Sequence, residues 1–489
     1  MTTLTRWFTA AILLGSGLCW NLQPATAKDE LPNLVKRLNE SFDRVQGSSK
    51  SYDPLFKAYL ELTDPPANID DSESLIQVWN GMDGWDKVAD WAKANTSVTD
   101  VMVQTQDRFI LGLPYGEENV PSEFREAGLC IRVGIDGNIA AMDYPYFKAI
   151  RMLGILGTAQ MNRLAEDKKF DEAFDIGMAT LRMLRQACDQ QMLQEKFFSF
   201  QELSEGLQSH RNLMYQYLEQ VPADIFRRLG TKEYPFLKPT DNQRLKRMEM
   251  PEGDRLVAEA VLDSAFNDDG QPDPEVFAST FSVIQAKDAP LTQFGAAKRW
   301  MRIAEVHGSL DASKEKLTDI YDDWWRRWKM RQYNEMMDLP TELSKVNTIR
   351  YAAVMMTVTD IQLLFRAREQ LITEINGTTI SAGLCGYHVE FDSWPNDKEK
   401  VYALYAPKRF DFDPYDAGYG RLIYRYLGDQ RKAIETAIGR VWITGCVLYA
   451  KGRDLRDNMY SEHTFNGENG DLIIWPPVRQ LAREEGLVD

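Results

Sequence analysis

The sequence predicts a mainly α-helical protein: a helical bundle that ends in a small C-terminal α+β module. Apolar residues recur every three or four positions through most of residues 146–376, which is typical of amphipathic helices. Short β-type runs bounded by Gly and Pro are concentrated after residue 409. The chain has 489 residues with 44% hydrophobic and 11% aromatic residues, enough for a large core and two to four domains.

The amino terminus has the layout of a secretory signal peptide. Arg6 precedes an apolar run from Trp7 to Trp20, and the small-residue pattern Ala25-Thr26-Ala27 follows. We therefore expect residues 1–27 to be removed and the protein to be exported to the periplasm or the extracellular space. An uncleaved anchor is the alternative. No later segment has the length and apolarity of a membrane span, so none is expected after signal removal.

Residues 28–145 are expected to form an N-terminal region of helices and loops. Apolar spacing is helical from Leu31 to about Leu62, and Asp64-Pro65-Pro66 ends it because proline disfavours helix at the preceding residue. A short helix begins after Asp83-Gly84-Trp85. Gly, Pro and β-branched residues dominate residues 108–145, which predicts loop with one hairpin.

Residues 146–345 are expected to form a helical bundle. Two amphipathic stretches separated by Asp167-Lys168-Lys169 predict an antiparallel helical hairpin. Further helical patterns cover 192–220, 253–263, 274–306 and 311–337. The segment Lys169–Phe174 resembles the second helix of a tetratricopeptide unit, but no second copy recurs at a fixed period, so a plain bundle is favoured.

The last region, residues 346–489, is predicted to hold one long helix and a small antiparallel sheet. The helix is expected to run from Val346 to about Asn376 and to stop at Gly377. Strands are expected at 422–426, 441–449 and 472–475.

Composition excludes several function classes. The formal net charge of −16 opposes binding to nucleic acid. The sequence lacks the nucleophile elbow, phosphate-binding loop and dinucleotide fingerprint, and its four histidines are isolated, so no catalytic or cofactor-binding residue is assigned. Four cysteines follow the signal segment, which leaves two disulfides or four buried thiols open. Tyr321, Trp324 and Trp328 share one helix face, which is either a core face or an aromatic binding surface.

A polar loop near the end of the chain is the one candidate metal site. Hard cations such as Ca²⁺ take six to eight oxygen ligands from flexible loops. Asp454, Asp457, Asn458 and Asp471 supply carboxylate and amide oxygens before and after the loop. The alternative is a loop in which these side chains only cap turns.

The order of motifs in this region resembles the C-terminal part of the type II secretion major pseudopilin. The motifs are Asp413-Pro414 with a Gly-containing turn, Leu448-Tyr449-Ala450-Lys451-Gly452-Arg453-Asp454, and Asp471-Leu472-Ile473-Ile474-Trp475. The region is also similar to the closing module of large secreted bacterial proteins of uncharacterised function, whose Trp-containing motif is echoed by Gly84–Trp91. The resemblance implies Ca²⁺ ligation at Asp454 and Asp471. Ala450 replaces the usual Ser, Leu455 replaces the usual Gly, and the family's amino-terminal helix is absent.

These observations favour an exported envelope protein with a binding or scaffold role, whose protein or envelope partner the sequence does not identify. A secreted hydrolase of polysaccharide or peptide, with its site between the helical body and the C-terminal module, is the first alternative. It requires two facing carboxylates in a cleft. A tetratricopeptide-like adaptor is the second alternative, and it requires a concave groove along residues 146–220.

Overall fold

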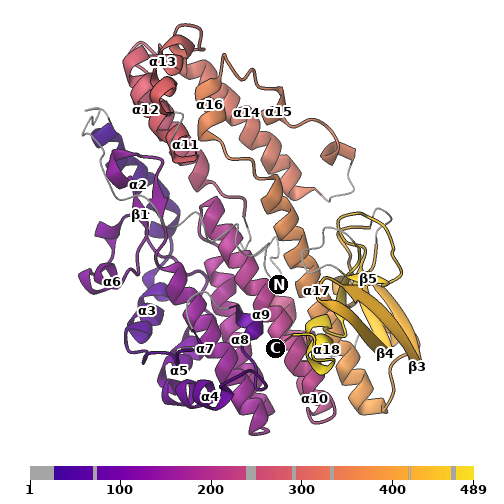
Figure 1. Ribbon diagram of the computed structural model, residues 1–489. Coiled ribbons are helices and arrows are strands. Elements are labelled where there is room, and N and C mark those ends of the chain that lie inside the picture. Colours follow the sequence, from indigo (N-terminus) through magenta and orange to yellow (C-terminus); the bar gives the residue numbers. More distant parts are fainter. Residues whose placement is uncertain are drawn as a thin grey trace.

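The protein is a helical body with a small sheet at its carboxyl-terminal end, as the sequence predicts (Figure 1). The computed structural model describes residues 27–69, 74–237, 249–288, 293–330, 335–402, 404–416, 418, 420–463 and 470–488. The predicted signal segment, up to residue 26, lies outside the described residues. None of the described helices is long and apolar enough to cross a membrane.

The N-terminal region contains the predicted helices and hairpin, with one difference. The stretch from Leu31 to Leu62 forms two helices, because residues 44–51 leave the helix and place Ser51 in a backbone hydrogen bond to Ile110. The short strands β1 and β2 pair antiparallel, which confirms the expected hairpin. The elements are α2 (Ala27–Asp43), α3 (Tyr52–Leu60), α4 (Trp85–Ala94), α5 (Thr96–Thr105), α6 (Ser122–Glu126), β1 (Arg132–Val133) and β2 (Met142–Asp143).

The predicted helical hairpin lies in the middle of the body. Helix α7 (Phe147–Glu166) and α8 (Phe170–Ala187) pack side by side, and α9 (Leu193–Gln216) packs on both. Helices α4 and α5 cover their other side, so α7 is buried along most of its length. This burial places α7 and α8 in the core instead of along a concave surface.

Helices α11 to α16 extend away from this centre, with the α12–α13 hairpin at their far end, whereas α10 packs against α17 (Gln362–Phe391) (Figure 1). The pattern over 274–306 divides into two helices. On α14, Tyr321, Trp324 and Trp328 are buried, which confirms the core interpretation of this aromatic face. The elements are α10 (Ala223–Arg228), α11 (Gly253–Ala265), α12 (Pro274–Asp288), α13 (Gln293–Ala304), α14 (Leu310–Lys329), α15 (Glu342–Lys345) and α16 (Ala352–Thr357).

The long helix α17 (Gln362–Phe391) does not follow the predicted bounds. The sequence predicts a helix that stops at Gly377, whereas Gly377 lies in the middle of α17 and the preceding residues form the separate helix α16. Gly377 is needed for close packing, because a Cβ built there would lie 2.5 Å from Ile474 of the sheet. A glycine that accommodates a neighbouring strand therefore has the same sequence signature as a helix stop.

The three predicted strands are present in one four-stranded sheet of order β5-β3-β4-β6. Strands β3 (Ile423–Thr436) and β4 (Gly439–Ala450) form a long antiparallel hairpin with Ile423 opposite Tyr449. Strand β6 (Leu472–Trp475) pairs antiparallel with the end of β4, and β5 (Glu462–His463) pairs parallel with β3. Helix α18 (Val478–Glu484) follows β6 and packs against β4 and α9.

The main hydrophobic cluster is continuous from Leu34 of α2 to Trp475 of β6. It crosses the predicted boundaries at residues 145 and 345, and the division into 28–145, 146–345 and 346–489 stays a prediction. A second, smaller cluster joins the sheet to α18. Cys130, Cys188, Cys385 and Cys446 are all buried and unbridged, which agrees with the thiol alternative.

Candidate functional site

The structure brings the four predicted metal ligands into one loop at the end of the sheet. Asp454, Asp457 and Asn458 follow β4, and Asp471 directly precedes β6. Because Ala450 pairs with Leu472, the two segments leave the sheet side by side. The predicted juxtaposition therefore follows from antiparallel pairing of β4 and β6.

Asp471 closes the loop by accepting backbone hydrogen bonds. Its Oδ1 accepts the N–H of Asn458 at 3.2 Å and its Oδ2 accepts the N–H of Tyr460 at 2.7 Å. Burial raises the pKa of Asp471 to about 7, although these two hydrogen bonds favour the ionised form, and the nearby Asp457 and Asp454 raise it further. Both carboxylate oxygens of Asp471 are thus already engaged by the chain.

The other three side chains also form hydrogen bonds within or beside the loop. Asp454 accepts the N–H of Arg456 at 3.0 Å and the Nδ2–H of Asn458 at 3.2 Å. Asp457 accepts the hydroxyl of Tyr449 at 2.9 Å. The bond from the N–H of Arg456 to Asp454 joins an Asp side chain to the residue two positions later, which is an Asx turn. The observed geometry is therefore that of a loop capped by its own side chains.

The backbone of this loop explains one departure from the pseudopilin pattern. Leu455, where that pattern has Gly, adopts a left-handed conformation with φ of 59°. Met459 and Tyr460 do so as well, each with φ of 52°. The left-handed backbone conformation favours glycine, because the Cβ of any other residue crowds the following carbonyl. The loop keeps a glycine-type conformation without the glycine.

The four residues as placed do not fit a bound Ca²⁺ ion. Among the described residues, no group of three or more His, Cys, Asp or Glu side chains is positioned to hold a metal ion. A calcium ion would have to replace the hydrogen bonds from Asn458 and Tyr460 to Asp471. The calcium site stays a prediction of the resemblance.

Asp413 has a structural role that the sequence did not reveal. Its carboxylate is fully buried and accepts the N–H of Tyr415 at 2.9 Å and the N–H of Lys451 at 3.0 Å. The ammonium of Lys451 lies 2.6 Å from Asp416. These contacts hold the Asp413-Pro414 turn against the start of the loop that carries the four predicted metal ligands, which we call the Asp loop. An Asp before a Pro is a weak sequence signal for this role, because the partner that joins the two segments, Lys451, lies 38 residues away.

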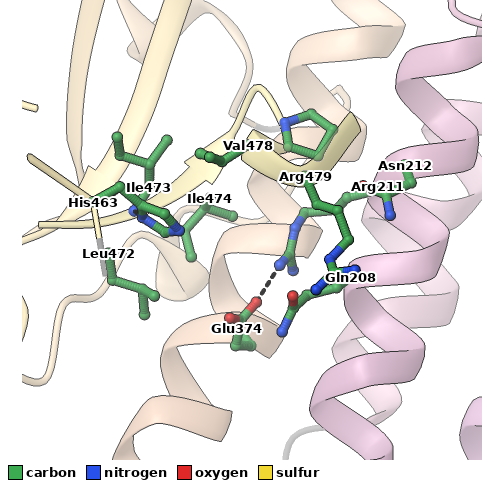
Figure 2. A pocket seen from close by; sticks show the side chains of 11 residues that line it. Gln208, Arg211, Asn212, Glu374, His463, Leu472, Ile473, Ile474, Val478 and Arg479 are labelled. Atoms are coloured by element: carbon green, nitrogen blue, oxygen red, sulfur yellow. Dashed lines mark hydrogen bonds and ion pairs between the residues drawn. The ribbon is translucent and has the colours of Figure 1, made fainter. Parts of the chain in front are cut away.

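A pocket opens where the helical body meets the sheet (Figure 2). We call it the junction pocket. Its volume for the centres of water molecules is about 20 Å³, room for one or two waters. Its polar lining comes from α9 and α17, with His463 of β5 and Arg479 of α18, and its apolar lining comes from β6 and the start of α18. The lining residues are Gln208, Arg211, Asn212, Glu374, His463, Leu472, Ile473, Ile474, Pro477, Val478 and Arg479.

One side of the junction pocket is a buried ion pair between α9 and α17. Arg211 is paired with Glu374, as Figure 2 shows, and also donates to the hydroxyl of Thr378 at 2.5 Å. The relative exposure of the two charged side chains is 4% and 3%. Burial raises the pKa of Glu374, and the charge and hydrogen bond of Arg211 act in the opposite direction. This pair fixes the geometry of the pocket wall.

Two other polar side chains in the pocket have no such partner. Asn212 is buried, with a relative exposure of 6%, and its side chain forms no hydrogen bond with any described residue. Arg479 donates no hydrogen bond to a described residue, and its Nε is buried without a partner. Buried polar groups in native proteins are nearly always satisfied by protein, water or ligand. These two side chains were not predicted, because an Asn and an Arg 267 positions apart carry no local pattern.

The four histidines are hydrogen-bonded residues of the fold, as expected. His210 contacts the hydroxyl of Tyr234 at 3.1 Å, and burial lowers its pKa to about 3. His463 accepts the N–H of Ile473 at 3.1 Å, and burial lowers its pKa to about 4, so it is neutral at pH 7. His307 accepts a backbone N–H of α16, and His388 lies 3.0 Å from Glu219.

No protein-family model, curated protein or solved structure matches the chain. The Asp loop and the junction pocket are the two candidate sites among the described residues.

Proposed function

We propose that this chain is an exported, non-catalytic binding protein of the cell envelope that holds a small ligand in the junction pocket. One observation carries the proposal: the pocket leaves Asn212 and Arg479 without partners although both are largely removed from solvent. Unsatisfied buried groups cost free energy that a bound ligand recovers.

The character of the pocket favours binding over hydrolysis. A glycosidase needs two carboxylates that face each other across the substrate, one to donate a proton and one to attack or activate water. The junction pocket has one carboxylate, Glu374, and it is neutralised by Arg211. A carboxylate held by a buried guanidinium is a poor proton donor, because the pair stabilises its charged form.

We retain the likeness of the C-terminal region to pseudopilins as part of this proposal. A long helix, α17, precedes an antiparallel sheet, and Asp413 fastens its Asp-Pro turn to the Asp loop. These features support a shared type of module. In this protein α17 is packed among α9, α10 and β6, which suits a scaffold role better than assembly through an exposed helix. The adaptor alternative has less support, because α7 is buried instead of lining a groove.

The test combines binding and turnover on the same samples. The protein from residue 28 onwards is mixed with oligosaccharides, short peptides and small organic acids; ligand-observed NMR detects binding and mass spectrometry detects products. We expect binding without conversion, weakened by Asn212→Ala and not by Arg440→Gln, an exposed control on β4. Product formation that is lost in Glu374→Gln would overturn the proposal in favour of the hydrolase. Absence of binding in every ligand class would overturn it as well.

A further inference from the structure

We propose that the ligand of the junction pocket is a small monocarboxylate, held by Arg479 with help from Asn212 and Gln208. This inference rests on the proposed function, because it names the ligand class for the same pocket. Three observations support it: the N–H donors of the pocket, the local charge and the shape of the apolar wall.

The free donors converge from two elements. Arg479 extends from α18 toward Gln208 of α9, as Figure 2 shows, and Asn212 lies one helical turn further along α9. The amide of Gln208 makes only a long contact, 3.5 Å, with Ser204. A guanidinium and side-chain amides together present several N–H groups to one acceptor, and a planar carboxylate can accept two parallel bonds from an arginine.

The charge around Arg479 favours a ligand with one negative charge. Arg479 lies near a second guanidinium group, that of Arg483, and the one carboxylate among the described residues whose charge acts on Arg479 is Glu205. Glu374 forms an ion pair with Arg211. Glu205 accepts a hydrogen bond from the hydroxyl of Ser74 at 2.6 Å and another from a backbone N–H. Arg479 therefore keeps a positive charge with no counter-ion in contact, in a chain whose formal net charge is −16.

The burial of Arg479 supports the same conclusion. Removal from solvent lowers the pKa of Arg479, and only the more distant Glu205 opposes this effect. Burial and the neighbouring Arg479 also lower the pKa of Arg483 to about 9. An anion seated beside Arg479 stabilises both guanidinium groups at once.

The apolar wall and the small volume select the type of anion. Leu472, Ile474 and Val478 line the side opposite the helices, so a ligand with a short alkyl part gains by contact with them. The pocket is too small for a sugar ring without rearrangement. A phosphate dianion would bring two charges to one unpaired guanidinium, and the excess charge would be poorly solvated. A monocarboxylate as small as acetate fits the volume and meets the charge, the hydrogen bonds and the apolar wall together.

The experiment is a thermal and calorimetric titration of the protein from residue 28 onwards with acetate, propionate and butyrate. Chloride and phosphate at matched ionic strength are the comparison ligands. Binding to the folded state raises the melting temperature with the logarithm of ligand concentration. We expect acetate to raise it more than butyrate, chloride or phosphate does, with affinity at least about tenfold weaker in Arg479→Gln and unchanged in Arg440→Gln. Arg440 carries the same group on the exposed face of β4, where it pairs with Glu435.

The outcomes separate this inference from the proposed function. Equal shifts with acetate and chloride, or acetate binding undiminished in Arg479→Gln, overturn the carboxylate assignment. A neutral ligand whose binding is lost in Asn212→Ala overturns the assignment and leaves the proposed binding function intact. If Arg479→Gln does not fold, Arg479→Lys replaces it, and retention of full affinity and selectivity in that variant would overturn bidentate recognition.

Discussion

Removal of Arg211 is the most informative perturbation of the junction. Arg211→Met keeps much of the side-chain volume but leaves Glu374 buried without its counter-ion. Loss of one partner from a buried ion pair costs about 3 to 5 kcal/mol in other proteins. Both charged side chains here have relative exposures of 4% or less, so we expect a value inside that range at pH 7.5.

The pH dependence of this loss identifies its cause. Without Arg211, the folded-state pKa of Glu374 lies further above its unfolded value, because burial raises it and the opposing charge is gone. A group whose pKa is raised in the folded state favours folding below its unfolded pKa, and this advantage disappears as pH rises through the folded pKa. The variant should therefore recover much of the lost stability on acidification to about pH 5.

The assay is urea denaturation of wild type, Arg211→Met and the double variant Arg211→Met/Glu374→Met at both pH values. The double variant removes the charge as well as its partner, so it should be more stable than the single variant at pH 7.5. A loss below about 1 kcal/mol that does not change with pH would refute the reasoning, because it would mean that Glu374 finds another partner or solvent.

Four further predictions concern the rest of the molecule. Leu455→Gly should stabilise the protein by about 0.5 to 1 kcal/mol in urea denaturation, because Leu455 is half exposed and has a positive φ; a loss would contradict the loop geometry. Gly377→Ala should destabilise it by about 1 to 2 kcal/mol, because the new methyl group would meet Ile474; unchanged stability would contradict this packing. Burial raises the pKa of Glu202 to about 7, so the melting temperature should fall between pH 5 and 8, and Glu202→Gln should weaken this dependence; a rise over that range would contradict the prediction. Calcium at about 1 mM should not change the melting temperature, and a calcium-dependent rise lost in Asp454→Ala would instead support the metal site.

The fold class was predictable because helical periodicity and β-type runs are local features. The hairpin α7–α8 and strands β3, β4 and β6 all lie where apolar spacing places them. Gly377 was misread because its meaning depends on Ile474, which lies on a strand far away in the sequence. Local patterns cannot distinguish a glycine that ends a helix from one that lets another element approach.

The candidate sites were predictable to different degrees. The Asp loop could be found because its four polar residues flank two β-type runs that pair. The hydrogen bonds that engage its carboxylates come from backbone N–H groups, which the sequence does not specify. The junction pocket could not be found, because Asn212, Glu374 and Arg479 come from three distant helices. The alternative of a hydrolase site between the body and the C-terminal module stays a prediction.

The central claim is that the protein binds a ligand where the sheet meets the helical body. Hydrogen–deuterium exchange with and without acetate tests it most directly, because it reports the location of binding by residue range. We predict slower exchange in peptides that cover residues 204–216 and 470–484, with little change in α12 and α13. Slower exchange confined to other segments, or no change at saturating acetate, would contradict the claim.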